Sequence, residues 1–135
     1  MSKNRTDNPN IASDRIDSLE KDEIFVFGSN LEGKHLGGAA KAAHNRFGAQ
    51  WGVGVGLTGK SYAIPTMQGG IETIKPYVDQ FIEYAKEHQD KKFLVTRIGC
   101  GIAGFKDEEI APLFMKATSL KNVYLPISFL KANKN

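Results

Sequence analysis

Residues 24–48 read IFVFGSNLEGKHLGGAAKAAHNRFG, and they carry the clearest sign of the fold class in this sequence. The continuous run of β-forming apolar residues from Ile24 to Phe27 predicts a strand that is covered on both faces. Glycines follow this run, and apolar residues at helical spacing from Leu36 to Phe47 predict a helix that ends near Gly48. The segment therefore predicts a buried strand, a glycine-rich loop and a helix in succession.

Strands and helices are expected to alternate along the rest of the chain as well. The other expected elements are, in order, one or two strands over 51–66, a helix over 73–85, a strand over 93–98, a helix over 107–117 and a strand over 122–126. Such alternation predicts an α/β fold with a mixed, largely parallel sheet and helices on both faces.

The length of 135 residues, with 41% hydrophobic and 24% charged residues, fits one globular domain with one core. Residues 1–22 are polar with few apolar side chains, so we expect a flexible N-terminal arm. Residues 23–130 are expected to form the single domain, and residues 131–135 a frayed tail.

The charge and the cysteine content limit which binding partners and which cellular compartment we expect. The net charge of +3 comes from 18 basic and 15 acidic side chains without a basic run, so we expect no dedicated nucleic-acid surface. Cys100 is the only cysteine, which favours a reducing compartment. No secretory signal is visible, and no apolar run approaches the roughly 18 residues that span a bilayer. A cytoplasmic location without a membrane partner is expected.

The 14 glycines are clustered, and two clusters lie where a buried strand passes into a helix: Gly28 to Gly38 and Gly99 to Gly104. The carboxyl ends of parallel strands share one edge of a sheet, so both loops should face a common cleft. Glycines before a helix expose backbone amides to which a phosphate can come close. The glycines could instead serve only tight turns and packing, but their paired placement favours a phosphate-bearing ligand.

A third cluster matches a familiar motif in the wrong context. Residues 54–61 read GVGLTGKS, which fits both the P-loop string GxxxxGK[ST] and the dinucleotide string GxGxxG. Both motifs require a helix directly afterwards, whereas the following residues, YAIPT, indicate a strand ended by Pro65. We therefore interpret this cluster as turns and strands, and a P-loop nucleotide hydrolase is a less favoured alternative.

Two segments, FGSNLEGKHLGGAAKAA at 27–43 and GCGIAGF at 99–105, together resemble the macro-domain family, whose members bind ADP-ribose. The resemblance covers roughly residues 24–126 and implies a three-layer α/β/α fold. The stretches TRIGCGIAGF and SYAIPT are similar to the branch with ADP-ribose glycohydrolases of the TARG and DarG type, and to small phage-associated macro-like proteins.

The resemblance implies a site for ADP-ribose or a related nucleotide diphosphate. Asn30 would contact the distal ribose, the amides of the two loops would bind the diphosphate, and Phe105 would pack on the ribose. The implied ligand-binding residues are Asn30, Gly37, Gly38, Ala39, Gly99, Cys100, Gly101, Ile102, Ala103, Gly104 and Phe105. We expect no metal or other cofactor, because two backbone loops can neutralise a diphosphate and the histidines show no metal-ligand spacing.

Hydrolysis of an ADP-ribosyl bond needs a group that attacks the anomeric carbon or activates water. The similar branch carries a Lys and an Asp at positions that are here Met67 and Ala103. Replacement candidates, each with an ordinary structural role as well, are His35, Lys60, Cys100 and Asp107. The sequence therefore favours a non-catalytic module that binds ADP-ribose or an ADP-ribosylated macromolecule. A hydrolase with non-standard residues is the alternative, and a ligand-free interaction protein is less favoured.

Overall fold

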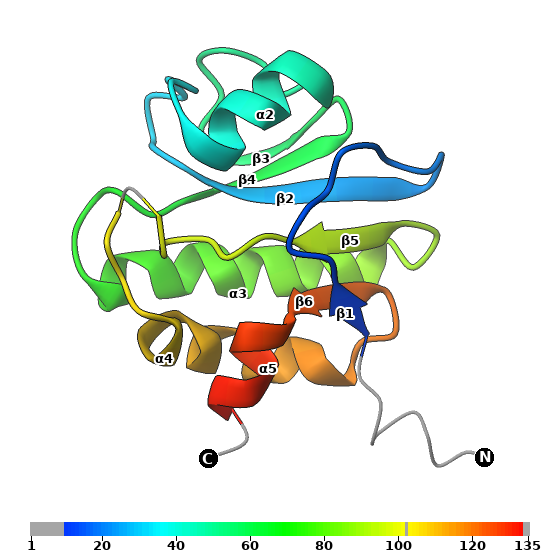
Figure 1. Cartoon of the computed structure of the whole chain (residues 1–135), viewed down its shortest axis with the longest axis vertical. Coiled ribbons are helices and arrows are strands. Elements are labelled where there is room, and N and C mark those ends of the chain that lie inside the picture. The colour runs from blue at the N-terminus through cyan, green and yellow to red at the C-terminus, as the bar shows by residue number, and fades with distance from the viewer. Residues whose placement is uncertain (1–9, 102, 134–135) are drawn as a thin grey trace.

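The computed structural model describes residues 10–101 and 103–133 (Figure 1). Expectations for residues 1–9, for Ile102 as a ligand contact and for residues 134–135 lie outside the described residues. The elements are, in order, β1 (Ile11–Ala12), β2 (Glu23–Ser29), α2 (Gly38–Arg46), β3 (Gly56–Thr58), β4 (Ser61–Pro65), α3 (Ile71–Glu87), β5 (Lys92–Val95), α4 (Asp107–Ile110), the 3-10 helix η1 (Ala111–Ser119), β6 (Val123–Pro126) and α5 (Ile127–Asn133).

The six strands form one sheet in the order β1-β6-β5-β2-β4-β3. Every neighbouring pair is parallel except β3 and β4, which form an antiparallel hairpin. Strand β2 lies inside the sheet, with Phe25 in register with Ser61 of β4 on one side and Leu94 of β5 on the other. The predicted α/β class and the largely parallel sheet are confirmed.

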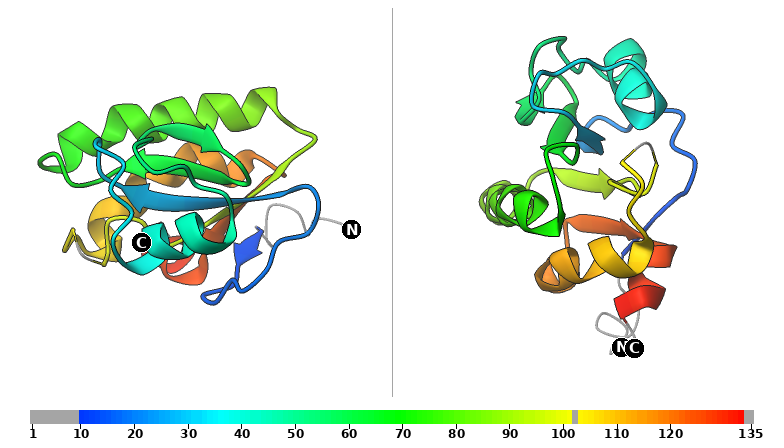
Figure 2. Two further views of the ribbon diagram at one scale, coloured as in Figure 1. Left: turned by 90° about the horizontal axis from the view of Figure 1, so that it is seen from above. Right: turned by 90° about the vertical axis from the view of Figure 1, so that its left-hand side faces the viewer.

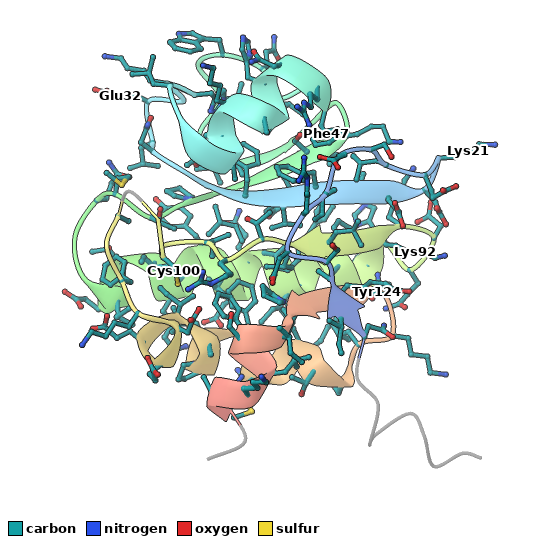
Figure 3. The ribbon with its side chains drawn as sticks, in the orientation of Figure 1. Lys21, Glu32, Phe47, Lys92, Cys100 and Tyr124 are labelled. Carbon is teal, nitrogen blue, oxygen red and sulfur yellow. The ribbon has the colours of Figure 1, made fainter. Side chains whose placement is uncertain are left out.

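Side chains of β2 alternate between two cores, because successive residues of a strand point to opposite faces. Ile24 and Val26 are buried with side chains of α3 and η1, whereas Phe25 and Phe27 are buried with side chains around α2. Phe47 follows α2 and packs on Phe25, with ring centroids 4.7 Å apart (Figure 3). Helices therefore cover both faces of the sheet, and Figure 2 shows α2 and α3 on opposite sides.

Two short elements depart from the sequence-based expectations. Strand β1, inside the expected arm of residues 1–22, pairs in parallel with β6 and forms one edge of the sheet. Helix α5 includes Lys131 to Asn133, which we expected to be part of a frayed tail. Its Phe129 is fully buried and stacks on Phe114 of η1 at 5.7 Å. Both elements are too short to form alone and depend on the surfaces they pack against.

Three boundaries also differ. Helix α3 begins at Ile71, with Gly70 as its N-cap, so Thr73 lies in the first turn and does not cap the helix. The strand expected over 93–98 ends at Val95. The helix expected over 107–117 is divided into α4 and η1, with Pro112 in the first turn of η1, where it needs no amide hydrogen bond.

Candidate functional site

A cavity of about 490 Å³ lies at the carboxyl ends of β2, β4 and β5. Ser29 ends β2, and Thr66 and Thr96 follow β4 and β5 directly; all three line the cavity. Gly28 lies close to the segments that follow both neighbouring strands: a Cβ there would be 3.2 Å from Thr66 Oγ1, just after β4, and 3.4 Å from the Gly99 nitrogen in the loop after β5. Residues of both glycine-rich loops line this one cavity, and Figure 1 shows both loops at the same edge of the sheet.

The first loop places Asn30, Lys34, Gly37, Gly38 and Ala39 in the cavity wall. The Asn30 side chain closes the loop, because it accepts a hydrogen bond from the Lys34 amide (2.9 Å) and donates one to the Lys34 carbonyl (3.0 Å). Gly38 begins α2 with a φ of +57°, a conformation that favours glycine.

The N-terminus of α2 presents free donors at this wall. Among the described residues, the amides of Gly38, Ala39 and Ala40 have no hydrogen-bond acceptor. The first turn carries no acidic side chain that could compete with an anion for them. Unpaired amides at the positive end of a helix favour a negatively charged ligand.

The second loop is folded on itself. The Phe105 amide donates to the Gly99 carbonyl (2.8 Å), and the Gly104 amide donates to the Gly101 carbonyl (3.0 Å). In the described part of the chain, the amides of Gly99, Gly101 and Ala103 have no acceptor, and these three residues line the cavity. The two loops thus offer backbone donors to one space.

Two of the implied ligand residues do not line the cavity. Gly104 lies in the turn of the second loop, and the half-buried Phe105 packs against the core cluster that contains α3 and η1. Phe105 is close to Gly99, since a Cβ at Gly99 would be 3.5 Å from Phe105 Cδ2. In this structure the Phe105 side chain packs on the core beneath the second loop and does not line the cavity.

Several lining residues were missed in the sequence, above all Ser29, Thr66, Thr96 and Arg97. Each lies at or just after the end of a parallel strand, and that position is the signal that could have found them. Thr96 Oγ1 donates to the Val26 carbonyl (2.9 Å) and ties the end of β5 to β2. Leu36 and Met67 add exposed apolar side chains to the lining.

A polar network fixes the start of the second loop. Arg97 donates two hydrogen bonds to Asp107, from Nε to Oδ1 (3.1 Å) and from Nη2 to Oδ2 (2.9 Å). Asp107 Oδ1 also accepts hydrogen bonds from Ser128 Oγ (3.1 Å) and Cys100 Sγ (3.5 Å). The bond from Arg97 is the main cause that lowers the pKa of the Asp107 carboxyl. Asp107 therefore stays a carboxylate that holds three segments together.

Cys100, labelled in Figure 3, lines the cavity from the loop between β5 and α4. Burial, followed by the negative charge of Asp107, raises the pKa of its thiol to about 11. At neutral pH the thiol is almost entirely protonated, which makes it a weak nucleophile.

This raised pKa predicts a distinctive alkylation profile for the single cysteine. The rate of carbamidomethylation by iodoacetamide should rise about tenfold for each pH unit from 8 to 10, because only the thiolate reacts. An ordinary thiol, with a pKa of about 8.5, should approach its maximal rate in the same interval. Mass spectrometry gives the rates, and circular dichroism at each pH checks that the chain is folded. A plateau near pH 9 would contradict the burial of Cys100.

Two other residues considered for chemistry are away from the cavity lining. His35 is buried at 2% exposure, with its Nε2 3.0 Å from the Gln50 carbonyl oxygen and its ring against Phe27. Lys60 Nζ donates to the Glu20 carbonyl (2.6 Å) from the turn of the β3–β4 hairpin. The P-loop string thus ends in a strand and not in a helix, as interpreted from the sequence.

A second cavity of about 500 Å³ adjoins the first. It lies between the chain segment from Ser13 to Ile16, strand β2 at Phe25, and helix α2. The two cavities share four lining residues, Gly38, Ala39, Thr96 and Arg97. They are therefore two compartments that meet between α2 and the end of β5.

Fold and site define this chain as an α/β protein with a two-compartment cleft at the carboxyl edge of a largely parallel sheet. No protein-family model matches the chain, and neither does any curated protein or solved structure. Within residues 10–101 and 103–133, no cluster of three or more His, Cys, Asp and Glu side chains could hold a metal ion. In the same residues, no helix has the length and apolar character needed to cross a membrane.

Proposed function

We propose that the cleft binds ADP-ribose or a closely related nucleotide diphosphate. The observation that carries this proposal is the pair of glycine-rich loops that face one cavity with unpaired amides. Donors come from the N-terminus of α2 on one side and from the loop after β5 on the other. Oriented backbone amides can hold a diphosphate between them without a metal ion.

The two compartments suit a ligand with two ends. ADP-ribose consists of adenosine and a distal ribose that are joined by a diphosphate. We assign the diphosphate to the junction at Gly38 and Thr96, the distal ribose to the compartment with Asn30, and adenosine to the compartment with Phe25. Because the Asn30 amide group already holds Lys34, its first role in this assignment is to shape the loop.

A macro-domain relationship is part of this proposal, including the three-layer α/β/α arrangement of that family. Three features support it: the largely parallel mixed sheet, the helices on both of its faces, and glycine-rich loops after β2 and β5. The order of these features along the chain is the one that the sequence resemblance implies. A cytoplasmic setting and a link to phage proteins belong to the same proposal.

We favour binding over hydrolysis. Met67 and Ala103 line the cavity where the similar glycohydrolase branch carries Lys and Asp. No carboxylate or histidine is among the described lining residues of the first cavity, and the Cys100 thiol is protonated at neutral pH. General base or nucleophilic catalysis would need such a group beside the anomeric carbon. The function supported best is a module that recognises ADP-ribose, free or attached to a macromolecule.

Calorimetric titration of the full chain with ADP-ribose, AMP and Mg-ATP tests this function. We expect ADP-ribose to bind more tightly than AMP, because only ADP-ribose fills both compartments. Preferential binding of Mg-ATP with release of phosphate would instead support a P-loop hydrolase. Release of free ADP-ribose from a modified protein would show a hydrolase. No binding of any of the three would favour an interaction protein without a nucleotide ligand.

A further inference from the structure

Arg97 occupies a special position in the two-compartment cleft. It follows β5 and lines both cavities, at the junction with Gly38 and Ala39 of α2. Its side chain is 52% exposed, so part of the guanidinium group is open to a ligand although the group is paired with Asp107. A molecule that fills both compartments must pass this side chain.

The pairing with Asp107 fixes the plane of the guanidinium group without using all its donors. The two hydrogen bonds to Asp107 use two of the five N–H groups, and the other three have no acceptor among the described residues. Asp107 is in turn held by Ser128 of α5 and by Cys100. Because the side chain is already ordered, a ligand that binds it causes little further loss of side-chain entropy.

The other cations of the cleft lining single out the same residue, and the described acidic side chain of this lining is Asp14 in the second cavity. In the first cavity the described cations are Lys34 and Arg97, and in the second they are Arg15 and Arg97. Lys34 lines only the first cavity and Arg15 only the second, so neither of them borders both compartments. Arg97 is the described cation common to both compartments, where the proposed diphosphate would lie.

We propose that the Arg97 guanidinium contacts the diphosphate of the bound ligand and adds a charged contact to the backbone amides of the two loops. This inference rests on the proposed function, because it assigns one further residue of the same site. It differs from the sequence-based expectation, in which backbone amides alone neutralise the diphosphate.

The test compares Arg97→Met with Arg97→Lys in titrations against ADP-ribose, inorganic pyrophosphate and adenosine. We expect Arg97→Met to weaken ADP-ribose binding by about 10- to 30-fold, as the loss of a charged hydrogen bond does, and to abolish pyrophosphate binding. Adenosine affinity should change by less than about twofold. Arg97→Lys should bind more tightly than Arg97→Met but less tightly than wild type, since lysine keeps the positive charge but cannot reproduce the paired hydrogen bonds of the guanidinium group. Wild-type affinity for ADP-ribose should also fall more steeply with NaCl than that of Arg97→Met.

Arg46→Met is the matched control, because it removes the same charge from an exposed, ion-paired arginine that lines neither cavity. It should leave ADP-ribose affinity within about twofold of wild type, and urea unfolding checks that every variant is folded. An equal loss for adenosine and ADP-ribose, or no loss for either, would overturn the role of Arg97. If wild type binds no ADP-ribose, the proposed function fails. In that case, pyrophosphate binding that is lost in Arg97→Met would still support an anion contact by Arg97. If wild type binds no pyrophosphate either, the anion contact is overturned as well.

Discussion

Replacing Gly54 with alanine should lower the free energy of unfolding by about 3 kcal/mol or more. A Cβ at Gly54 would lie 2.1 Å from the Asn30 carbonyl oxygen and 2.7 Å from the Leu31 carbonyl oxygen. Both contacts are with backbone, so no flexible side chain can move aside, and the first glycine-rich loop must shift. The hydrogen bond from Ser29 Oγ to the Gly54 carbonyl would be strained by the same movement. A loss of this size is a large share of the stability of a domain.

Urea unfolding followed by circular dichroism measures this effect. Gly101→Ala is the matched control, because Gly101 has no positive φ and a Cβ there would meet no described atom within 4 Å. The free energy of unfolding of Gly101→Ala should lie within about 0.5 kcal/mol of the wild-type value. Wild-type stability of Gly54→Ala would contradict the close contact of residue 54 with the backbone of the first loop. A large loss of stability would also show that Gly54, the first glycine of the P-loop string, is needed for packing.

Replacing Gly101 with valine should weaken ADP-ribose binding by about a hundredfold or more while stability stays near wild type. Gly101 lines the first cavity, and its amide is among those without an acceptor in the described residues. A Cβ at Gly101 would meet no described atom within 4 Å, so we expect the free protein to accept valine, whose side chain would fill volume that the diphosphate needs. A hundredfold loss corresponds to about 2.8 kcal/mol of binding free energy.

Titration calorimetry with ADP-ribose measures the loss, and urea unfolding confirms that the variant is folded. Gly101→Ala adds one carbon and should give a smaller decrease. Adenosine provides the internal control, because Gly101 lines only the first compartment and the proposed adenosine compartment lies beyond the junction. Unchanged affinity of Gly101→Val for ADP-ribose would remove the second loop from the site.

The elements that could be predicted from the sequence are those with a strong local signal. The apolar runs of β2 and β5 predict buried strands, and the regular apolar spacing of α3 predicts a long helix. Strand β1 and helix α5 could not be predicted, because the two residues of β1 pair with β6 and Phe129 of α5 packs on Phe114 of η1. Their stability comes from partners that are distant in the sequence.

The residues of the candidate site also divide into those that the sequence could predict and those that it could not. The two glycine-rich loops could be placed at one cleft, because strand-to-helix junctions of parallel strands share an edge of the sheet. The threonines that follow β4 and β5, and Arg97, carry no motif and become visible as a site only when the strand ends meet. Phe105 was assigned to the ligand from its place in a resemblance, whereas the folded loop packs it on the core.

By itself, the sequence determined the α/β class, the order of the elements from β2 to β6 and the two glycine-rich junctions, since these depend on local pattern and on the shared direction of parallel strands. Only the tertiary structure decided which glycines border the cleft and which relieve backbone crowding, as at Gly54. It alone revealed the second compartment and placed Arg97 between the two. The physical reason is that a cavity and a close backbone contact arise between segments far apart in the chain, where local spacing carries no information about distance.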